Sequence, residues 1–252
     1  MSRSLFAPLA LLLLATSVAA QEAAPVVTKL TADFGYVQAS GNSVVTTTSI
    51  GQKLTQTRGR LGLEQSFNFV YGEQQGTVNT NFLKAGLRGD YRLVGKFSAF
   101  LSVAYDRNTF AGIERRFEEN LGLSLRAITA PRDTLRMELG ASVTQQTSTD
   151  GTVSDFPAAR AAFAYRHLFS PASFFLQTVE AIPNFKDTDD FRVNTESSVV
   201  APISARIGVK VSYVVRFDHL PEPGFQKTDR IFTTGVQIPF ECPAARRPPR
   251  AA

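Results

Sequence analysis

The sequence predicts an all-β protein, a transmembrane antiparallel up-and-down β-barrel of about 12 strands. Apolar and polar residues alternate with a period of two in stretches of roughly 9 to 13 residues, the length that a tilted strand needs to cross a bilayer. Gly, Pro, Asp or Asn separate these stretches. After the N-terminal segment, no run approaches the roughly 18 consecutive apolar residues of a membrane helix.

Each expected strand has one apolar face, with polar residues between its members. The clearest case is residues 60–71, where Arg60, Glu64 and Asn68 alternate with large apolar residues. In chain order, the apolar faces are Leu30, Ala32, Phe34 and Tyr36; Val44, Ile50 and Leu54; Leu61, Leu63, Phe67, Phe69 and Tyr71; Leu83, Ala85, Leu87 and Tyr91; Phe97, Ala99, Leu101, Val103 and Tyr105; Leu121, Leu123, Leu125 and Ala127; Leu135, Met137, Leu139, Ala141 and Val143; Ala159, Ala161, Phe163 and Tyr165; residues 174–181, apolar on both faces; Phe191, Val193 and Val199; Ala205, Ile207, Val209, Val211, Tyr213 and Val215; and Phe232, Val236, Ile238 and Phe240.

The two ends of the chain lie outside the expected barrel. Residues 1–20 have the pattern of a signal peptide, with Arg3, an apolar stretch and small residues before Gln21. Residues 21–28 are expected to form an N-terminal periplasmic segment, residues 29–240 the barrel, and residues 241–252 a Pro/Arg-rich tail. An exported barrel without a helical anchor is expected in the outer membrane of a Gram-negative bacterium.

The composition fits this interpretation. The chain is 43% hydrophobic with a mean hydropathy of −0.06, because the polar face of each strand offsets its apolar face. The formal charge is +5 and the pI about 9.5, but the basic residues are scattered, so no nucleic-acid partner is expected. The single cysteine, Cys242, excludes a framework of internal disulfides.

The connectors are expected to be of two alternating kinds. Short periplasmic turns are predicted near Gly59, Gly95, Pro131, Pro171 and Pro202, and longer external loops around Gln74, Asn108, Thr149, Asp187 and Pro221. The turn at Gly41 is the exception among the external connectors. One expected loop covers residues 106–116. No connector exceeds roughly 12 residues, which is shorter than the inward-folded loop of general porins.

The faces opposite the apolar ones predict a polar lumen with an excess of cations. Charges of both signs in a narrow interior should pair, because unpaired ones cost several kcal/mol. The candidates for lining the lumen are Arg60, Glu64, Lys84, Arg88, Asp90, Arg126, Arg136, Glu138, Arg160, Glu196, Arg206 and Lys210.

The sequence offers little for catalysis or metal binding. His167 is expected at the membrane interface and His219 in an external loop, and neither stands in a nucleophile motif. Asp187, Asp189 and Asp190 form an acidic loop without the spacing of a calcium site. No catalytic residue, metal or cofactor is therefore expected.

Two segments are more specific than alternation. They are residues 105–116, YDRNTFAGIERR, and residues 221–230, PEPGFQKTDR, which follow Gly35-Tyr36 and Ser40-Gly41-Asn42 in the chain. Together they resemble a bacterial family of unknown function whose members are often labelled salt-induced outer membrane proteins. The residues of this chain that match the motif are Asp106, Arg107, Phe110, Gly112, Pro221, Gly224 and Asp229.

The resemblance runs from about Thr31 to Phe240 and implies an outer-membrane barrel without an established activity. The last expected strand, which ends at Phe240, also resembles the aromatic-ended signal that barrel-assembly machinery recognises. Outer-membrane lipid and lipopolysaccharide are the other expected partners.

Three hypotheses of function follow. The first is a non-enzymatic barrel with a structural or envelope-stress role and a filled or narrowly open lumen. The second is a narrow anion-preferring pore for small solutes, a kind of porin. A more remote alternative is an outer-membrane hydrolase that uses His219.

Overall fold

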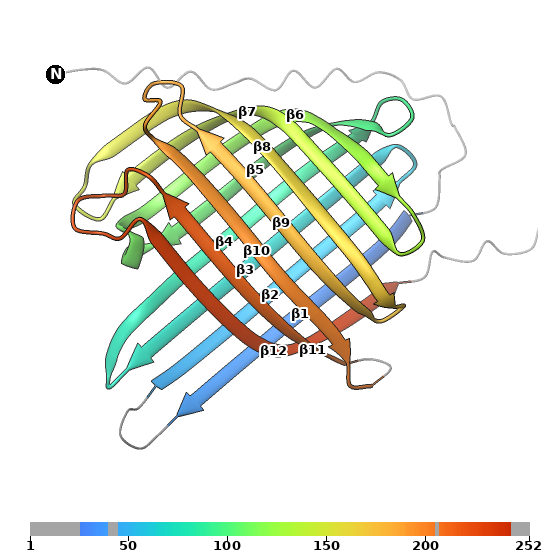
Figure 1. Ribbon diagram of the computed structural model, residues 1–252, viewed down its shortest axis with the longest axis horizontal. Helices are drawn as coiled ribbons and strands as arrows, with labels where there is room; N and C mark the ends of the chain where they lie inside the picture. Colours follow the sequence, from blue (N-terminus) through green and yellow to red (C-terminus); the bar gives the residue numbers. More distant parts are fainter. Residues whose placement is uncertain (1–25, 40–44, 205–206, 243–252) are drawn as a thin grey trace, which may run out of the picture.

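The computed structural model describes residues 26–39, 45–204 and 207–242, which form one closed barrel (Figure 1). The predicted fold class is confirmed. No helix of these ranges is long and apolar enough to span a membrane. The strands in these ranges are β1 (Val26–Ala39), β2 (Val45–Arg58), β3 (Leu61–Gln74), β4 (Thr77–Arg92), β5 (Phe97–Asn108), β6 (Ile113–Thr129), β7 (Asp133–Ser148), β8 (Val153–Ser170), β9 (Ser173–Pro183), β10 (Phe191–Pro202), β11 (Gly208–Asp218) and β12 (Thr228–Cys242), with one 3-10 turn, η1 (Thr109–Ala111), between β5 and β6.

Every strand pairs antiparallel with its neighbours in the chain, and β1 closes the barrel against β12. At this seam Leu30 lies opposite Phe240 and Phe34 lies opposite Val236. Closure gives every described strand a paired neighbour on both sides, so the sheet has no free edge strand, which a bilayer would not tolerate.

Side-chain burial is the reverse of that in a soluble domain. Large apolar side chains on the outer face are exposed, and Leu139 reaches 71%. Polar side chains on the inner face are buried, with Ser142 at 1% and Thr144 at 0%. Since an exposed apolar belt is stable only against lipid, this distribution identifies the outer face as the membrane surface.

The connections divide between two ends of the barrel. We call one the turn end, with residues 59–60, 93–96, 130–132, 171–172 and 203–207, and the other the loop end, with residues 40–44, 75–76, 109–112, 149–152, 184–190 and 219–227. Apart from 40–44, which lies outside the described residues, only the last two loop-end connections are clearly longer than the turns. The predicted long loop at Gln74 is wrong, because Gln75 and Gly76, with φ of 52° and 78°, make a tight two-residue turn.

The predicted loop over residues 106–116 is also wrong. Strand β5 continues to Asn108, and β6 already begins at Ile113. Gly112, with φ of 76°, allows the chain to reverse directly after η1. The correction matters for function because it places Arg116 and Glu118 on a barrel strand, with their side chains buried.

Strand pairing extends past both expected limits of the barrel. β1 begins at Val26, within the expected periplasmic segment, and β12 ends at Cys242, within the expected tail. The predicted signal peptide, residues 1–20, and residues 243–252 of the tail lie outside the described residues.

Candidate functional site

The centre of the lumen is organised around one carboxylate, Glu138 on β7, which is 5% exposed. Its Oε2 accepts hydrogen bonds from Arg88 Nη1 at 3.1 Å and Arg160 Nη1 at 2.7 Å. Its Oε1 lies 2.9 Å from both Arg88 Nη2 and Arg136 Nε, at ion-pair distance but without hydrogen-bond geometry. Three arginines therefore share this carboxylate.

Two further carboxylates balance these arginines. Arg88 donates to both oxygens of Asp90, with Nε and Nη2 each at 2.8 Å. Arg160 Nε donates to Glu180 Oε1 at 2.6 Å, and Asn194 donates to the other oxygen of Glu180 at 3.2 Å. We call these residues the central network; it runs from β4 to β10, and its buried groups are paired, as a low-dielectric interior requires.

An aromatic ring lies within the central network. Phe100 is 2% exposed, and the guanidinium carbons of Arg88 and Arg160 lie 4.2 Å and 5.4 Å from its ring centre. A Cβ at Gly122 would lie 2.9 Å from the ring, so the glycine makes room for it. Cation–π contacts on a buried ring add to the stability of the central network.

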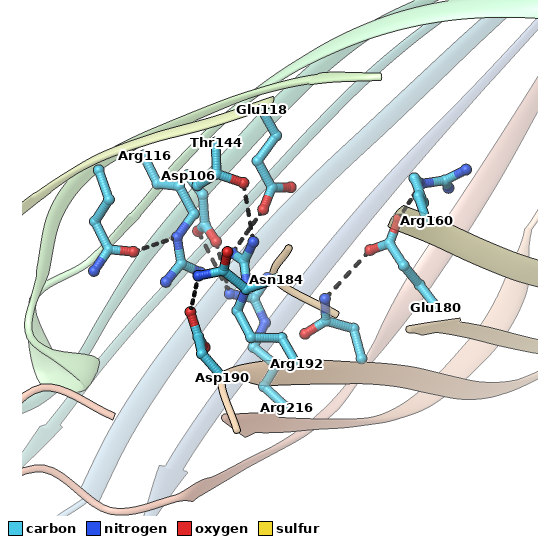
Figure 2. A network of polar contacts seen from close by, with 12 residues as sticks. Asp106, Arg116, Glu118, Thr144, Arg160, Glu180, Asn184, Asp190, Arg192 and Arg216 are labelled. Atoms are coloured by element: carbon cyan, nitrogen blue, oxygen red, sulfur yellow. Dashed lines mark hydrogen bonds and ion pairs between the residues drawn. The ribbon is translucent and has the colours of Figure 1, made fainter. Parts of the chain in front are cut away.

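Nearer the loop end, ion pairs join strands that are far apart around the barrel (Figure 2). Arg192 on β10 donates to Glu118 Oε1 on β6 at 2.8 Å and to Thr144 Oγ1 on β7 at 3.0 Å. Arg216 Nη1 on β11 donates to Asp106 Oδ2 on β5 at 3.1 Å. Five strands separate β5 from β11 in either direction around the barrel, so this pair connects opposite walls of the lumen.

The loop of residues 219–227 covers part of the mouth at the loop end. Glu222 Oε1 accepts hydrogen bonds from Gln146 Nε2 at 2.6 Å and Ser148 Oγ at 2.5 Å, both on β7. A Cβ at Gly112 would lie 2.8 Å from the Cβ of Glu222 and from the ring of Phe225. The connector of residues 219–227 thus covers part of the mouth although its length is ordinary, and the sequence analysis did not predict this.

The turn end is open by comparison. A cavity of about 150 Å³ is lined there by Arg60, Arg92, Arg126 and Arg136, with Glu64 and Asp90 among the other lining residues. Of the four arginines, only Arg136 has a carboxylate partner in the described part of the chain. Exposed, unpaired cations give this end a positive potential.

The loop-end cavity is smaller, about 40 Å³. Lys84, Arg116, Arg192 and Arg216 contribute cations to its walls, and Asp229 is one of its four carboxylates. The residues lining the two cavities do not overlap, and the central network borders both, because Asp90 and Arg136 line the turn-end cavity and Asn194 lines the loop-end cavity.

A third group of contacts follows the wall formed by β11, β12, β1, β2 and β3. Asp33 lies 3.0 Å from Lys210 Nζ and accepts a hydrogen bond from Gln237 at 2.7 Å. Lys53 Nζ lies 2.8 Å from Glu64 Oε1. Each of these contacts joins strands that are adjacent or separated by one strand, so this group follows the wall and does not cross the lumen.

The structure places the sequence-predicted lumen candidates as follows. Arg88, Asp90, Arg136, Glu138 and Arg160 meet in the central network; Arg60, Glu64 and Arg126 line the turn-end cavity and Lys84 the loop-end cavity; Lys210 pairs with Asp33; Glu196 is on the inner face, opposite Thr178 and Val214; and Arg206 lies outside the described residues.

The two segments that carry the family resemblance meet at the loop end. Asp106 pairs with Arg216; Arg107 lies 3.4 Å from Glu114; Phe110, in η1, is 44% exposed; Gly112 packs on residues 222 and 225; Pro221 lines the loop-end cavity; Gly224 has φ of 90°; and Asp229 accepts a hydrogen bond from Asn108 at 3.3 Å. Segments more than a hundred positions apart thus build one mouth.

Neither histidine lies in the lumen networks. His167 Nδ1 is 2.8 Å from Asp133 Oδ1 at the turn end, beside Tyr165, whose hydroxyl donates to the same oxygen. His219 Nδ1 lies 2.6 Å from the carbonyl oxygen of Asp189, and its ring stacks on Phe191 with centres 4.9 Å apart. Within the described residues, no three His, Cys, Asp or Glu side chains are grouped so that they could hold a metal ion.

A family model described as a protein of unknown function, DUF481, matches residues 32–240. The chain belongs to the DUF481 family. That description contains no activity and no stress condition, so the association with salt remains a prediction. A search of curated proteins found no similar sequence.

Solved structures resemble this DUF481 barrel in fold. The NanC porin aligns with a TM-score of 0.52 and 10% identity, over 82% of this chain and 98% of the porin. The COG4313 outer membrane channel from Pseudomonas putida F1 aligns with a TM-score of 0.47 and 11% identity, over 88% of this chain and 97% of the channel. At such identity the first match shows the fold of an outer-membrane channel and nothing of the solute.

Sequence reasoning missed part of the DUF481 lumen. The expected loop ends at Arg116 and the next expected apolar face begins at Leu121, so neither covers Glu118 as a strand residue, and Arg192 belongs to a strand whose alternation is weak. Phe100 was missed because it is apolar on a polar face. Continuing the alternation of β6 back from Leu121 to Ile113 would have found the first two.

Proposed function

We propose that this protein is a non-enzymatic outer-membrane barrel whose lumen is closed to the free flow of solutes by ion pairs, with a structural or envelope-stress role. The observation that carries the proposal is the Arg216–Asp106 pair, which joins opposite walls. The exposed apolar belt and the fold shared with NanC support the location in the outer membrane.

The closure is energetically robust because its charges are buried. Glu138 and Arg192 are 5% and 4% exposed, and each forms ion pairs with charged side chains. Separating such a pair leaves a buried charge without compensation, which costs about 3–5 kcal/mol. Salt in the medium screens pairs of this kind only weakly.

A second candidate is a narrow pore that prefers small anions. The unpaired arginines of the turn-end cavity favour it, because such a mouth raises the local concentration of anions. Ser142, Ser212 and Asn120 are also buried without a hydrogen-bond partner for one side-chain oxygen, a situation that internal water relieves. A hydrated lumen could conduct if the ion pairs rearranged.

The proposed partners are lipid, lipopolysaccharide and the barrel-assembly machinery. Phe240 is 49% exposed on the outer face of β12 and pairs with Leu30, so the aromatic end of the last strand lies at the seam where the barrel must close. An envelope-stress role predicts that cells lacking the protein lose growth or envelope integrity at high salt.

Single-channel conductance of the mature chain, refolded from Gln21 onward, tests the closure in a planar bilayer under a potassium chloride gradient. We expect silence from the wild type and openings from Asp106→Asn, which removes one charge of the cross-lumen pair at nearly constant volume. Glu119→Gln is the control, since Glu119 is exposed on the outer face opposite Val103 and Val143. Steady anion-selective openings of the wild type would instead establish the pore.

A further inference from the structure

We propose that the loop-end cavity is a binding site for one small anion, a halide or a carboxylate group, held by the guanidinium of Arg116. The site lies at one end of the lumen, and binding to it does not require an ion to pass through the barrel. It therefore goes beyond the proposed closure and does not depend on whether the barrel conducts.

The first argument is the incomplete bonding of Arg116. This side chain is 8% exposed, and its Nε donates to Gln146 Oε1 at 2.7 Å. No carboxylate of the described residues lies within the 4.0 Å of an ion pair with it. A guanidinium carries five donors, of which Gln146 takes one, and Arg116 is among the residues that line the cavity.

The second argument is the charge balance of the cavity walls. Glu118 and Asp106 are committed to Arg192 and Arg216, as Figure 2 shows. The remaining cations are Lys84, Arg116 and Lys227, and the remaining carboxylates are Asp218, which accepts from the backbone of Leu220, and Asp229, which accepts from Asn108. Among the lining side chains, three cations thus face two carboxylates, an excess of one positive charge that a single monovalent anion would neutralise. Glu222, on the covering loop but not in the lining, accepts hydrogen bonds from Gln146 and Ser148.

The third argument is size. A cavity of about 40 Å³ holds about three water molecules, given 10–15 Å³ for each. It therefore accepts a halide ion or a carboxylate head group, and not a larger acid as a whole. The planar fork of Arg116 matches the two oxygens of a carboxylate better than it matches a spherical ion.

The probe is chloride, observed by the line width of its 35Cl NMR signal in a solution of the refolded barrel. We expect a saturable broadening by the wild type that sodium acetate displaces. Arg116→Gln should lose most of this displaceable component. Arg115→Gln is the matched control and should keep it, because Arg115 is exposed and hydrogen-bonded to Thr147.

Two further variants keep the test decisive if Arg116→Gln fails to fold. Lys84→Gln removes a second cation of the cavity wall and should weaken chloride binding. Arg116→Lys retains the charge but not the planar guanidinium. It should therefore still broaden the chloride signal, but acetate should no longer bind more tightly than chloride.

Three results would overturn the site. The first is equal displaceable broadening by Arg115→Gln, Arg116→Gln and wild type, and the second is no displacement of chloride by acetate. The third is unchanged broadening in Lys84→Gln together with unchanged displacement by acetate in Arg116→Lys. Silence of the barrel in a bilayer would leave the site intact, and loss of chloride binding would leave the closed lumen intact, so the two proposals fail separately.

Discussion

At the loop end of the lumen Arg192 and Arg216 are paired across the barrel. At the turn end, by contrast, Arg60, Arg92 and Arg126 line an open cavity and have no ion-pair partner in the part of the chain that the structure describes. The same residue type thus serves two purposes. Where carboxylates face the arginines, the arginines join distant strands and close the space; where carboxylates are few, they make the mouth positive. The supply of carboxylates, and with it the pairing of the arginines, distinguishes the two ends.

The largest loss of stability is expected from Glu138→Ala, which removes the carboxylate shared by the paired arginines of the central network. This change leaves three arginines around an empty position and should lower the free energy of unfolding by about 3–5 kcal/mol. Denaturant unfolding of the barrel in lipid vesicles measures the loss. Leu139→Ala is the control on the outer face, where it removes only contacts with lipid, and an equal loss in both variants would contradict the central network.

An intermediate effect is expected from Gly112→Ala, which changes the fit of the loop 219–227 over the mouth. The new Cβ would add strain at a φ of 76° and collide with residues 222 and 225, at a cost of about 1–3 kcal/mol. Cleavage of that loop by an added protease should also become faster. Gly151→Ala is the matched control, because Gly151 has φ of 88° but nothing within 4 Å of its Cβ position; if both variants behave alike, the loop does not pack on Gly112.

The smallest effect is expected from Arg126→Gln at the turn end. Since Arg126 is exposed and has no ion pair in the described residues, its loss should change the free energy of unfolding by less than about 1 kcal/mol. In the background of Asp106→Asn it should reduce the preference of the openings for chloride over potassium, measured as a shift of the reversal potential. Destabilisation as large as that of Glu138→Ala would remove the distinction between the two ends.

Much of the fold could be predicted because it depends on a local pattern. Alternation as in residues 60–71 sets which side chains face lipid, and the number of such stretches sets the number of strands. The connectors were harder to predict. A two-residue turn with positive φ at Gln75 and the reversal at Gly112 both replaced loops that polar composition had suggested.

The candidate site was predictable only in part, and for a geometrical reason. Arg88, Glu138 and Arg160 could be assigned to the inner face from their parity, but parity does not say which arginine meets which carboxylate. The pair between Arg216 and Asp106 depends on the registers of several strand pairs around the circumference. An error of one position in any of them would move the partners apart.

The sequence by itself therefore determined that this chain forms a membrane barrel with an apolar outside and a charged inside, because that pattern repeats within each strand. Only the tertiary structure decided that the charges of the loop end pair across the lumen while those of the turn end do not. Barrel closure brings together residues such as Asp106 and Arg216 that neither share a strand nor lie on adjacent ones, and the distance between such residues depends on the strand count and stagger of the whole barrel.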